Sequence, residues 1–147
     1  MNLNGQASNQ SVLAFYLQDL DGGGAERSIV ALAGEVARRG HRVDLVVGDA
    51  HSDYRAEIDP QVRLIDFGTR SALSVFRHLW TYLRDHQPTA AMSALDLPNI
   101  MLVIAAKLAG FRGRVVISQR AVVNASLQDL PPIRRCVTQW LQRDRKS

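Results

Sequence analysis

The sequence predicts an α/β protein in which an open, parallel β-sheet carries helices on both faces. Two observations favour this class: short apolar segments alternate with segments of helical periodicity along the 147 residues, and the connections between them are short. Alternation of this kind implies parallel strands joined by right-handed crossovers. The length predicts one folded domain at residues 11–147, preceded by a polar, flexible N-terminus at residues 1–10.

The first strand and the first helix are expected at residues 11–17 and 25–39. The apolar run of the first segment is continuous and short, which is typical of a buried strand. The second segment ends at Gly40, because glycine commonly follows the last turn of a helix. We expect its apolar face to pack on the sheet; the face consists of Ile29, Leu32, Ala33, Val36 and Ala37.

The next two strands are expected at residues 42–47 and 62–67. The segment between them, residues 49–60, is polar and is predicted to be a loop. His41 lies between the first helix and the second strand, so a capping or packing role is favoured over catalysis.

The alternation continues through a helix at residues 71–86, a strand at 90–94, a helix at 98–108 and a strand at 114–118. The first of these helices has a predicted apolar face formed by Leu73, Phe76, Leu79, Trp80 and Leu83. We expect the two aromatic residues of this face in the core or at a domain interface.

A glycine loop joins the first strand to the first helix. It consists of Gly22, Gly23 and Gly24, and Glu26 and Arg27 follow in the first helical turn. The order strand, loop, helix brings backbone N–H groups and the positive end of a helix to one point, where a phosphate can bind. Glycine permits close approach of an anion and a turn with positive φ. We interpret the loop as a phosphate site to which Arg27 adds positive charge, although an ordinary flexible turn also fits three glycines.

Two other interpretations of this region are less favoured. A dinucleotide fingerprint needs a glycine three positions after Gly24, where Arg27 stands, although Asp49 could mimic the ribose-binding acid. Asp19 and Asp21 have the spacing of a metal-chelating pair, but they also suit a solvated loop and have no partner at an obvious spacing. We therefore predict neither a metal nor a cofactor.

The carboxyl ends of parallel strands form the binding edge of an open α/β sheet. Four segments are expected to meet there: the glycine loop, residues 48–53, residues 93–96 and residues 118–120. The candidate cleft residues outside the glycine loop are Ser93, Asp96, Ser118, Gln119 and Arg120.

Charge is concentrated near the C-terminus. From Arg112 onward there are eight basic and two acidic residues, which favours an anionic partner there over general nucleic-acid binding. The single cysteine, Cys136, excludes an internal disulfide and is interpreted as an apolar filler. The N-terminus lacks the features of a secretion signal, and the longest apolar stretch, residues 100–106, is too short to span a bilayer. These features predict a cytoplasmic protein.

A terminal helix is expected at residues 132–145. Its apolar residues, Ile133, Val137, Trp140 and Leu141, share one face, and basic residues flank it. This face either packs on the sheet, or the helix attaches peripherally to an anionic membrane surface. The proposed anion patch consists of Arg134, Arg135 and Arg143.

Several motifs resemble the N-terminal domain of glycosyltransferase family 4, which comprises retaining enzymes of the GT-B fold. The most specific are Gly23-Gly24-Ala25-Glu26-Arg27, Leu32-Ala33 and Arg39-Gly40-His41-Arg42-Val43. Further similarity lies in Gln87-Pro88-Thr89, in Lys107-Leu108-Ala109-Gly110 and in Val115-Val116-Ile117-Ser118. The resemblance covers about residues 11–143.

The resemblance implies one Rossmann-like half of a GT-B architecture. In that family the N-terminal domain mainly holds the acceptor, and the C-terminal domain mainly holds the nucleotide-sugar donor. The glycine loop is then expected to face the donor diphosphate, and Arg120 to lie near the acceptor. Many members carry a histidine near this position, where this chain has Gln119 and Arg120. Arg120 could bind an anion, but its pKa excludes a role as general base, so the catalytic residues are unknown.

Two functions follow from these observations. The first is retaining, nucleotide-sugar-dependent hexosyl transfer to a sugar or lipid-linked acceptor, as in polysaccharide or glycolipid biosynthesis. The chain ends before the donor-binding domain that such enzymes possess, so we expect only the acceptor-side half, which needs a missing or separate partner. The alternative is a non-catalytic nucleotide- or protein-binding module.

Overall fold

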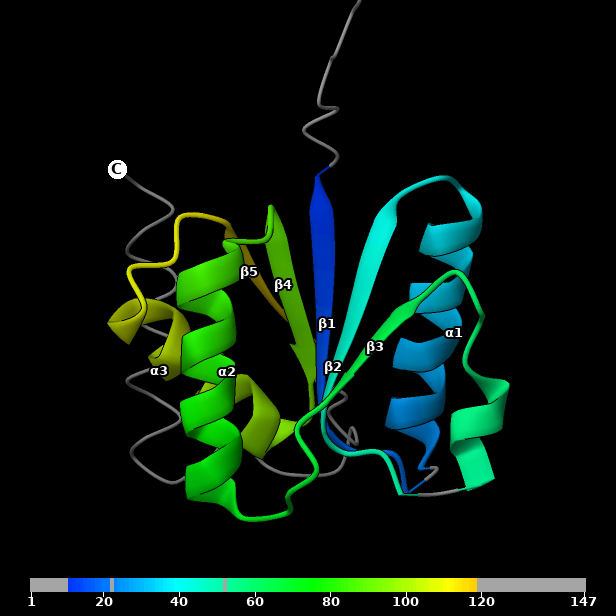
Figure 1. Ribbon diagram of the computed structural model, residues 1–147, viewed down its shortest axis with the longest axis horizontal. Helices are drawn as coiled ribbons and strands as arrows, with labels where there is room; N and C mark the ends of the chain where they lie inside the picture. Colours follow the sequence, from blue (N-terminus) through cyan, green and yellow to red (C-terminus); the bar gives the residue numbers. More distant parts are fainter. Residues whose placement is uncertain (1–10, 22, 52, 119–147) are drawn as a thin grey trace, which may run out of the picture.

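The computed structural model describes residues 11–118, except Gly22, Ser52 and the side chain of Asp53, and contains one parallel sheet of five strands in the order β3-β2-β1-β4-β5 (Figure 1). This arrangement confirms the predicted fold class. All four strand pairings are parallel. The strands are β1 (Val12–Asp19), β2 (Arg42–Asp49), β3 (Arg63–Asp66), β4 (Ala90–Ala94) and β5 (Arg114–Ser118).

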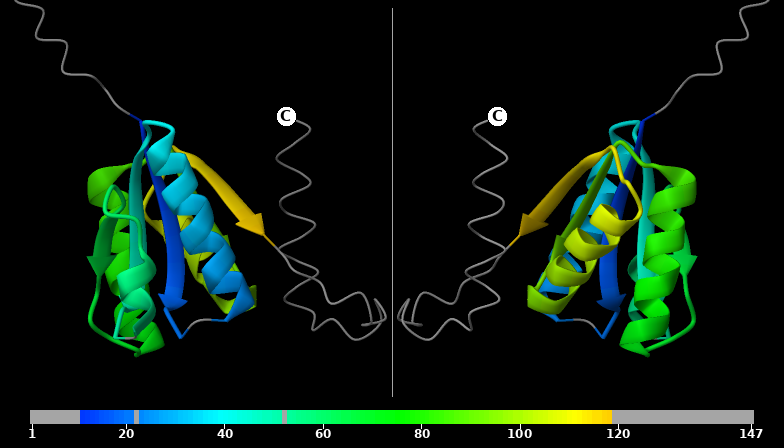
Figure 2. Two further views of the ribbon diagram at one scale, coloured as in Figure 1. Left: turned by 90° about the vertical axis from the view of Figure 1, so that its right-hand side faces the viewer. Right: turned by 90° about the vertical axis from the view of Figure 1, so that its left-hand side faces the viewer.

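Helices cover both faces of the sheet, as Figure 2 shows from the side. Helix α1 (Gly24–Arg38) packs on one face, and α2 (Ala72–His86) and α3 (Asp96–Leu108) pack together on the other. A short 3-10 helix, η1 (Asp53–Glu57), lies within the segment that the sequence predicts as a loop. Among the described residues, no helix combines the length and the apolarity needed to cross a bilayer.

Two hydrophobic clusters hold these layers together. Because side chains of a strand alternate between its faces, Phe15 and Leu17 of β1 point towards α1, whereas Tyr16 points towards α2 and α3. Strand β1 is hydrogen-bonded on both sides, to β2 and to β4. It extends two residues beyond its predicted end because Asp19 still pairs with Asp49 of β2.

The predicted apolar faces of α1 and α2 each contain one residue that is exposed. Leu32 is 40% exposed and Leu73 is 71% exposed. In α1 the buried positions are Ile29, Val30, Ala33, Gly34 and Ala37, and in α2 they are Val75, Leu79, Tyr82 and Leu83. At 3.6 residues per turn, Leu32 and Leu73 lie more than a quarter-turn from the centres of these faces. Phe76 and Trp80 of α2 are half-buried against the core, as expected.

Strand β2 carries the buried carboxylate of Asp44. Asp44 is 3% exposed, and Arg63 of β3 donates to it from Nε at 2.8 Å and from Nη2 at 2.6 Å. The hydroxyl of Tyr82 in α2 donates to its Oδ2 at 2.7 Å. Burial, and then the bond to Asp44, raises the pKa of Tyr82. The carboxylate thus joins β2, β3 and α2, and its charge is fully hydrogen-bonded.

We expect Tyr82→Phe to lower the free energy of unfolding by about 2 kcal/mol, because it removes a buried hydrogen bond to a charged group. The control is Tyr16→Phe, whose hydroxyl donates to the neutral Oε1 of Gln18 at 3.0 Å and should contribute about 1 kcal/mol. Urea denaturation of both variants measures the difference. A larger loss for Tyr16→Phe would contradict the assigned importance of Asp44.

Candidate functional site

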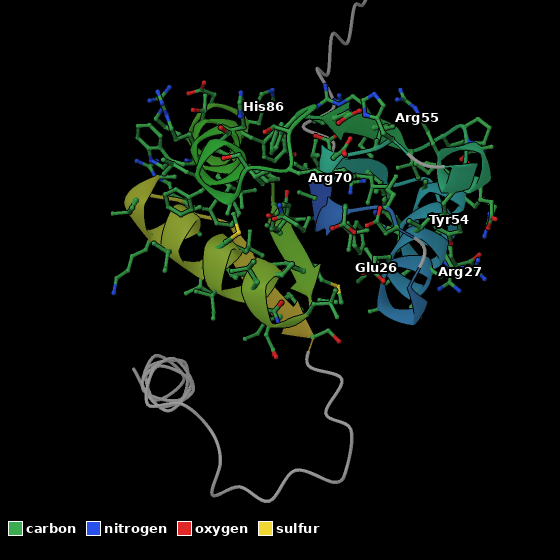
Figure 3. All side chains as sticks on the ribbon, turned by 90° about the horizontal axis from the view of Figure 1, so that it is seen from below. Glu26, Arg27, Tyr54, Arg55, Arg70 and His86 are labelled. Atoms are coloured by element: carbon green, nitrogen blue, oxygen red, sulfur yellow. The ribbon has the colours of Figure 1, made fainter. Side chains whose placement is uncertain are left out.

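The strands are parallel, so their carboxyl ends all lie on the same side of the sheet, which we call the carboxyl edge. Figure 3 is viewed from this side. The strand order reverses between β1 and β4, which are neighbours. The loop after β1 leads to α1 on one face, and the loop after β4 leads to α3 on the other. Open α/β folds bind ligands outside the carboxyl ends of the strands, at the point where the loops diverge in this way. Here the glycine loop and residues 93–96 follow the two strands at this point.

The glycine loop forms the start of α1 without unusual backbone angles. Gly23 is the N-cap residue, with φ −64° and ψ 165°, and its carbonyl accepts from the N–H of Arg27 at 3.0 Å. Neither Gly23 nor Gly24 has positive φ, so the expectation of a positive-φ turn is wrong for these two positions. The N-cap side chain is absent, and the first N–H groups of the helix therefore lack a side-chain cap. Gly22 lies outside the described residues.

The carboxylate of Glu26 lies beside Gly23. A Cβ placed on Gly23 would lie 2.3 Å from Oε2 of Glu26, so a side chain there would displace this carboxylate. A carboxylate in the first turn is favourable near the positive end of α1. A Cβ placed on Gly24 would meet no atom within 4 Å. The open approach to the backbone is therefore at Gly24, beside a carboxylate that an incoming anion must tolerate.

Arg27 is directed towards η1. Its guanidinium carbon lies 5.4 Å from the centroid of the Tyr54 ring, a cation–π contact, and Figure 3 shows the two side chains together. This places the charge of Arg27 to one side of the loop in the present conformation. Its predicted part in anion binding stays a prediction that requires this contact to open.

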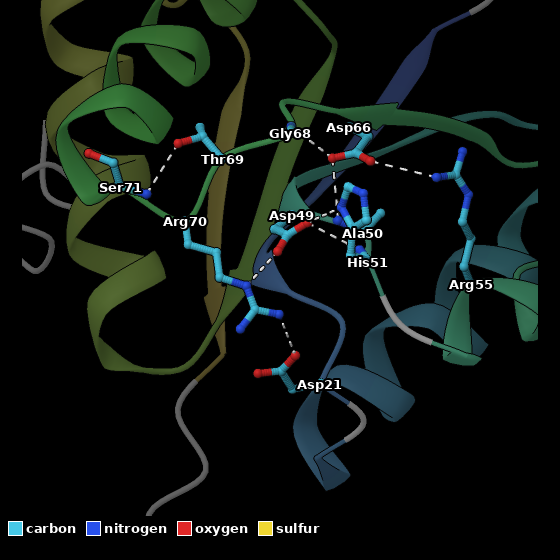
Figure 4. A network of polar contacts seen from close by, with 10 residues as sticks. All are labelled: Asp21, Asp49, Ala50, His51, Arg55, Asp66, Gly68, Thr69, Arg70 and Ser71. Atoms are coloured by element: carbon cyan, nitrogen blue, oxygen red, sulfur yellow. Dashed lines mark hydrogen bonds and ion pairs between the residues drawn. The ribbon is translucent and has the colours of Figure 1, made fainter.

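A cluster of ionic side chains lies over the ends of β1, β2 and β3 (Figure 4). Asp49, at the end of β2, is buried, and its Oδ2 accepts from Nε of Arg70. Its Oδ1 lies 2.6 Å from Nδ1 of His51 and accepts from the His51 N–H at 3.1 Å. Nη2 of Arg70 donates to Oδ1 of Asp21 at 3.2 Å. We refer to Asp21, Asp49, His51 and Arg70 as the ionic cluster.

Within the ionic cluster, the carboxylate of Asp49 is hydrogen-bonded to Arg70 and His51. Its hydrogen bond from Arg70, and then that from His51, lower its pKa to about 2. Both of its oxygens are occupied by neighbouring side chains, which argues further against the dinucleotide interpretation. Sequence reasoning did not identify Arg70. The signal was available, because Arg70 follows the third strand and every strand of a parallel sheet delivers its next loop to the same edge.

The two aspartates with metal-chelating spacing, Asp19 and Asp21, make hydrogen bonds with neighbouring groups. Oδ1 of Asp19 accepts from the N–H of Asp21 at 3.4 Å, and Asp21 pairs with Arg70. In the part of the chain that the structure describes, no three His, Cys, Asp or Glu residues are grouped as metal ligands. The interpretation of the pair as part of a solvated loop stays a prediction.

Hydrogen bonds between neutral groups connect the ends of β4 and β5. Ser93 of β4 is completely buried, and its Oγ donates to Oδ1 of Asn99 at 2.7 Å. Nδ2 of Asn99 donates to the carbonyl of Ser118, the last residue of β5, at 3.1 Å. Asp96 is exposed in the first turn of α3. Ser93 and Ser118 are thus brought together through Asn99, which sequence reasoning missed although it is a polar residue within an apolar helix.

Several predicted site residues lie outside the described part of the chain. They are Gln119 and Arg120 at the edge and Arg134, Arg135 and Arg143 in the proposed anion patch. Their roles, and peripheral attachment to a membrane, stay predictions.

The opposite, amino edge of the sheet carries a hollow of about 640 Å³ whose lining includes Arg84, Gln87, Thr89 and Arg112. Arg84 is paired with Asp85 at 2.8 Å. Two helices, α2 and α3, end there, so their negative ends oppose the binding of an anion. The carboxyl edge is therefore the stronger candidate.

Comparison with known protein families gives one finding for this chain. A model described as Glycosyltransferase Family 4 matches residues 22–144, and this match confirms the resemblance found in the sequence. No curated protein matches the chain.

We expect Asp49→Asn to reduce the acid sensitivity of the fold. The pKa of Asp49 is about 2 in the folded protein and 3.8 in its ordinary state. Between these values the unfolded chain binds more protons, so the stabilisation from ionised Asp49 is present above about pH 4 and is lost as the pH falls towards about 2. Urea denaturation across this interval should show a shallower pH dependence for the variant. Parallel curves for variant and wild type would contradict the assignment.

Proposed function

The chain belongs to glycosyltransferase family 4, and we propose that it is the acceptor-side half of a retaining enzyme that transfers a hexose from a nucleotide sugar. The observation that carries this proposal is the family match over residues 22–144. Membership supports a glycosyltransferase-type function, with a sugar donor and an acceptor as partners. The α/β sheet with its open carboxyl edge agrees with it.

We assign the glycine loop to the diphosphate of the donor. The loop follows β1, which is paired with β4. A Cβ on Gly24 would meet no atom within 4 Å, and the positive end of α1 lies at the loop. Glu26 limits the strength of this site, because its carboxylate shares the helix end with the incoming anion. The loop is therefore expected to orient a diphosphate that other groups bind more strongly.

We assign the acceptor to the ends of β4 and β5. Asp96 supplies an exposed carboxylate that can accept hydrogen bonds from sugar hydroxyl groups. The proposed acceptor residues Gln119 and Arg120 follow Ser118, whose carbonyl is fixed by Asn99. Ser93 is buried and contributes through Asn99 instead of by direct contact.

The described side chains at the carboxyl edge carry more negative than positive charge. The cations that neutralise a bound diphosphate are therefore expected to come from elsewhere. The described side chains around the ends of β1 to β3 include five carboxylates, from Asp19, Asp21, Glu26, Asp49 and Asp66. They include three guanidinium groups, from Arg27, Arg55 and Arg70. Glycosyl transfer needs the charge of the leaving diphosphate neutralised. We therefore propose that a donor-binding domain, encoded separately or beyond this chain, supplies those cations.

The test is nucleotide release from UDP-, GDP- and ADP-sugars by the purified chain, alone and with a candidate donor domain. We expect release near background from the chain alone and a turnover typical of enzymes, about 1 s⁻¹ or more, with the matching domain. Full activity of the chain alone would contradict the need for a partner. No release with any domain, together with binding of nucleotide or protein, would favour the alternative of a non-catalytic module.

We expect Gly24→Val to weaken pyrophosphate binding about tenfold or more while the fold is retained. A Cβ at this position would meet no atom within 4 Å, so we expect the added side chain to block the ligand without disturbing the core. Ala31→Val is the matched control, because Ala31 is exposed on the same helix, away from the loop. NMR titration measures the affinities. Equal affinity of wild type and Gly24→Val would remove the loop from the site.

A further inference from the structure

We propose that Arg70 is a positioning residue for the glycine loop: it connects Asp21, just before the loop, to Asp49, which is buried at the end of β2. This inference rests on the proposed function of the loop in binding a diphosphate. Arg70 need not touch the ligand. It acts by holding the residue from which the loop starts.

The anchor of this connection is rigid. Asp49 belongs to β2, which is hydrogen-bonded to β1 and to β3, and its side chain is only 10% exposed. His51 contacts the second carboxylate oxygen, so the carboxylate is held on both sides. The Nε of Arg70 donates to this fixed group. One side of the guanidinium is therefore fixed relative to the sheet.

The backbone that carries Arg70 is also fixed to β2. The N–H of Thr69 donates to the carbonyl of Gly48 at 2.8 Å, and the N–H of Phe67 donates to that of Val47 at 2.9 Å. Gly48 permits this approach, since a Cβ there would lie 2.5 Å from the Gln18 carbonyl oxygen and 3.2 Å from that of Thr69. The loop after β3 is therefore held against the end of β2, directly beside β1.

The free side of the guanidinium reaches the glycine loop. Nη2 of Arg70 donates to Oδ1 of Asp21 at 3.2 Å, and Figure 4 shows this bond extending from the α2 side to the α1 side of the cluster. Gly23 lies two residues after Asp21. The bond fixes the side chain of Asp21, and we propose that this restrains Gly23. The connection uses two donors, Nε and Nη2, which the planar guanidinium holds at a fixed separation, whereas the three donors of lysine share one nitrogen atom.

The same pairing makes Arg70 a poor direct ligand. Its guanidinium already contacts two carboxylates, so little net positive charge is offered to an anion. The Arg70–Asp21 pair is also exposed, at 60% and 59% of the two side chains, and exposed pairs contribute little to overall stability. The function left for the connection is local order at the loop.

A positioning role of Arg70 and a purely electrostatic role predict opposite effects of Asp21→Asn on the affinity for pyrophosphate. Asp21→Asn removes a negative charge beside the anion site, so electrostatics alone would tighten pyrophosphate binding. If Arg70 acts through Asp21, the same change weakens binding about threefold to tenfold, and Arg70→Gln does so to the same extent. The double variant should be no worse than either single variant. Arg70→Lys should bind pyrophosphate no better than Arg70→Gln, because lysine keeps the charge but replaces the two spaced nitrogen donors by a single nitrogen.

The experiment combines NMR titration of inorganic pyrophosphate with backbone order parameters of the unliganded protein. Arg70→Gln and Asp21→Asn are expected to lower the order parameters of Asp21 and Gly23 and to weaken binding. The control Arg55→Gln, which removes the 3.6 Å pair with Asp66 at the same edge, should change neither.

Unchanged or tighter binding by Asp21→Asn would overturn the proposal, as would rescue by Arg70→Lys. If wild type does not bind pyrophosphate, the proposed role of the loop fails, and the order parameters still decide this inference. Lower order parameters of Asp21 and Gly23 in Arg70→Gln and Asp21→Asn, but not in Arg55→Gln, would support the positioning role of Arg70. Unchanged order parameters would overturn it.

Discussion

The parallel direction of the five strands is the constraint on which the rest of the structure depends. It delivers the loop after every strand to one edge, and the right-handed crossovers then place α1 on one face and α2 and α3 on the other. Because the order reverses beside β1, the first loop and the loop after β4 lead away from each other. The position of the candidate site follows from this topology, and the side chains determine only what the site can bind.

The edge is divided by β1 into two halves of different chemistry. On the β2 and β3 side, Asp49 and Arg70 form an ionic cluster in which charges compensate one another. On the β4 and β5 side, Ser93 and Asn99 form neutral hydrogen bonds that end at the carbonyl of Ser118. The first half joins the loop after β3 to Asp21, and the second half joins the ends of β4 and β5 through buried groups. The proposed acceptor-side function uses the exposed residues beside the second half.

Within residues 11–118, local patterns predicted the five strands, the helices α1 to α3 and the position of the glycine loop, because periodicity and turn residues act over short distances. They could not predict the ionic cluster, since the pairing of Asp21 with Arg70 joins residues 49 positions apart and depends on the sheet order. The same holds for Asn99, whose polar role becomes visible only when β4 and β5 are neighbours. The exposure of Leu73 was misjudged because several helical faces fit the same apolar residues.

We propose that this chain uses the carboxyl edge of its sheet to hold a nucleotide sugar between the glycine loop and the acceptor residues. The most direct measurement is a map of backbone amide shifts during NMR titration with UDP- and GDP-sugars. We expect the largest shifts at Gly23, Gly24 and Asp96, which follow the neighbouring strands β1 and β4. Shifts confined to Thr89 and Arg112, in the hollow at the amino edge, would contradict the claim.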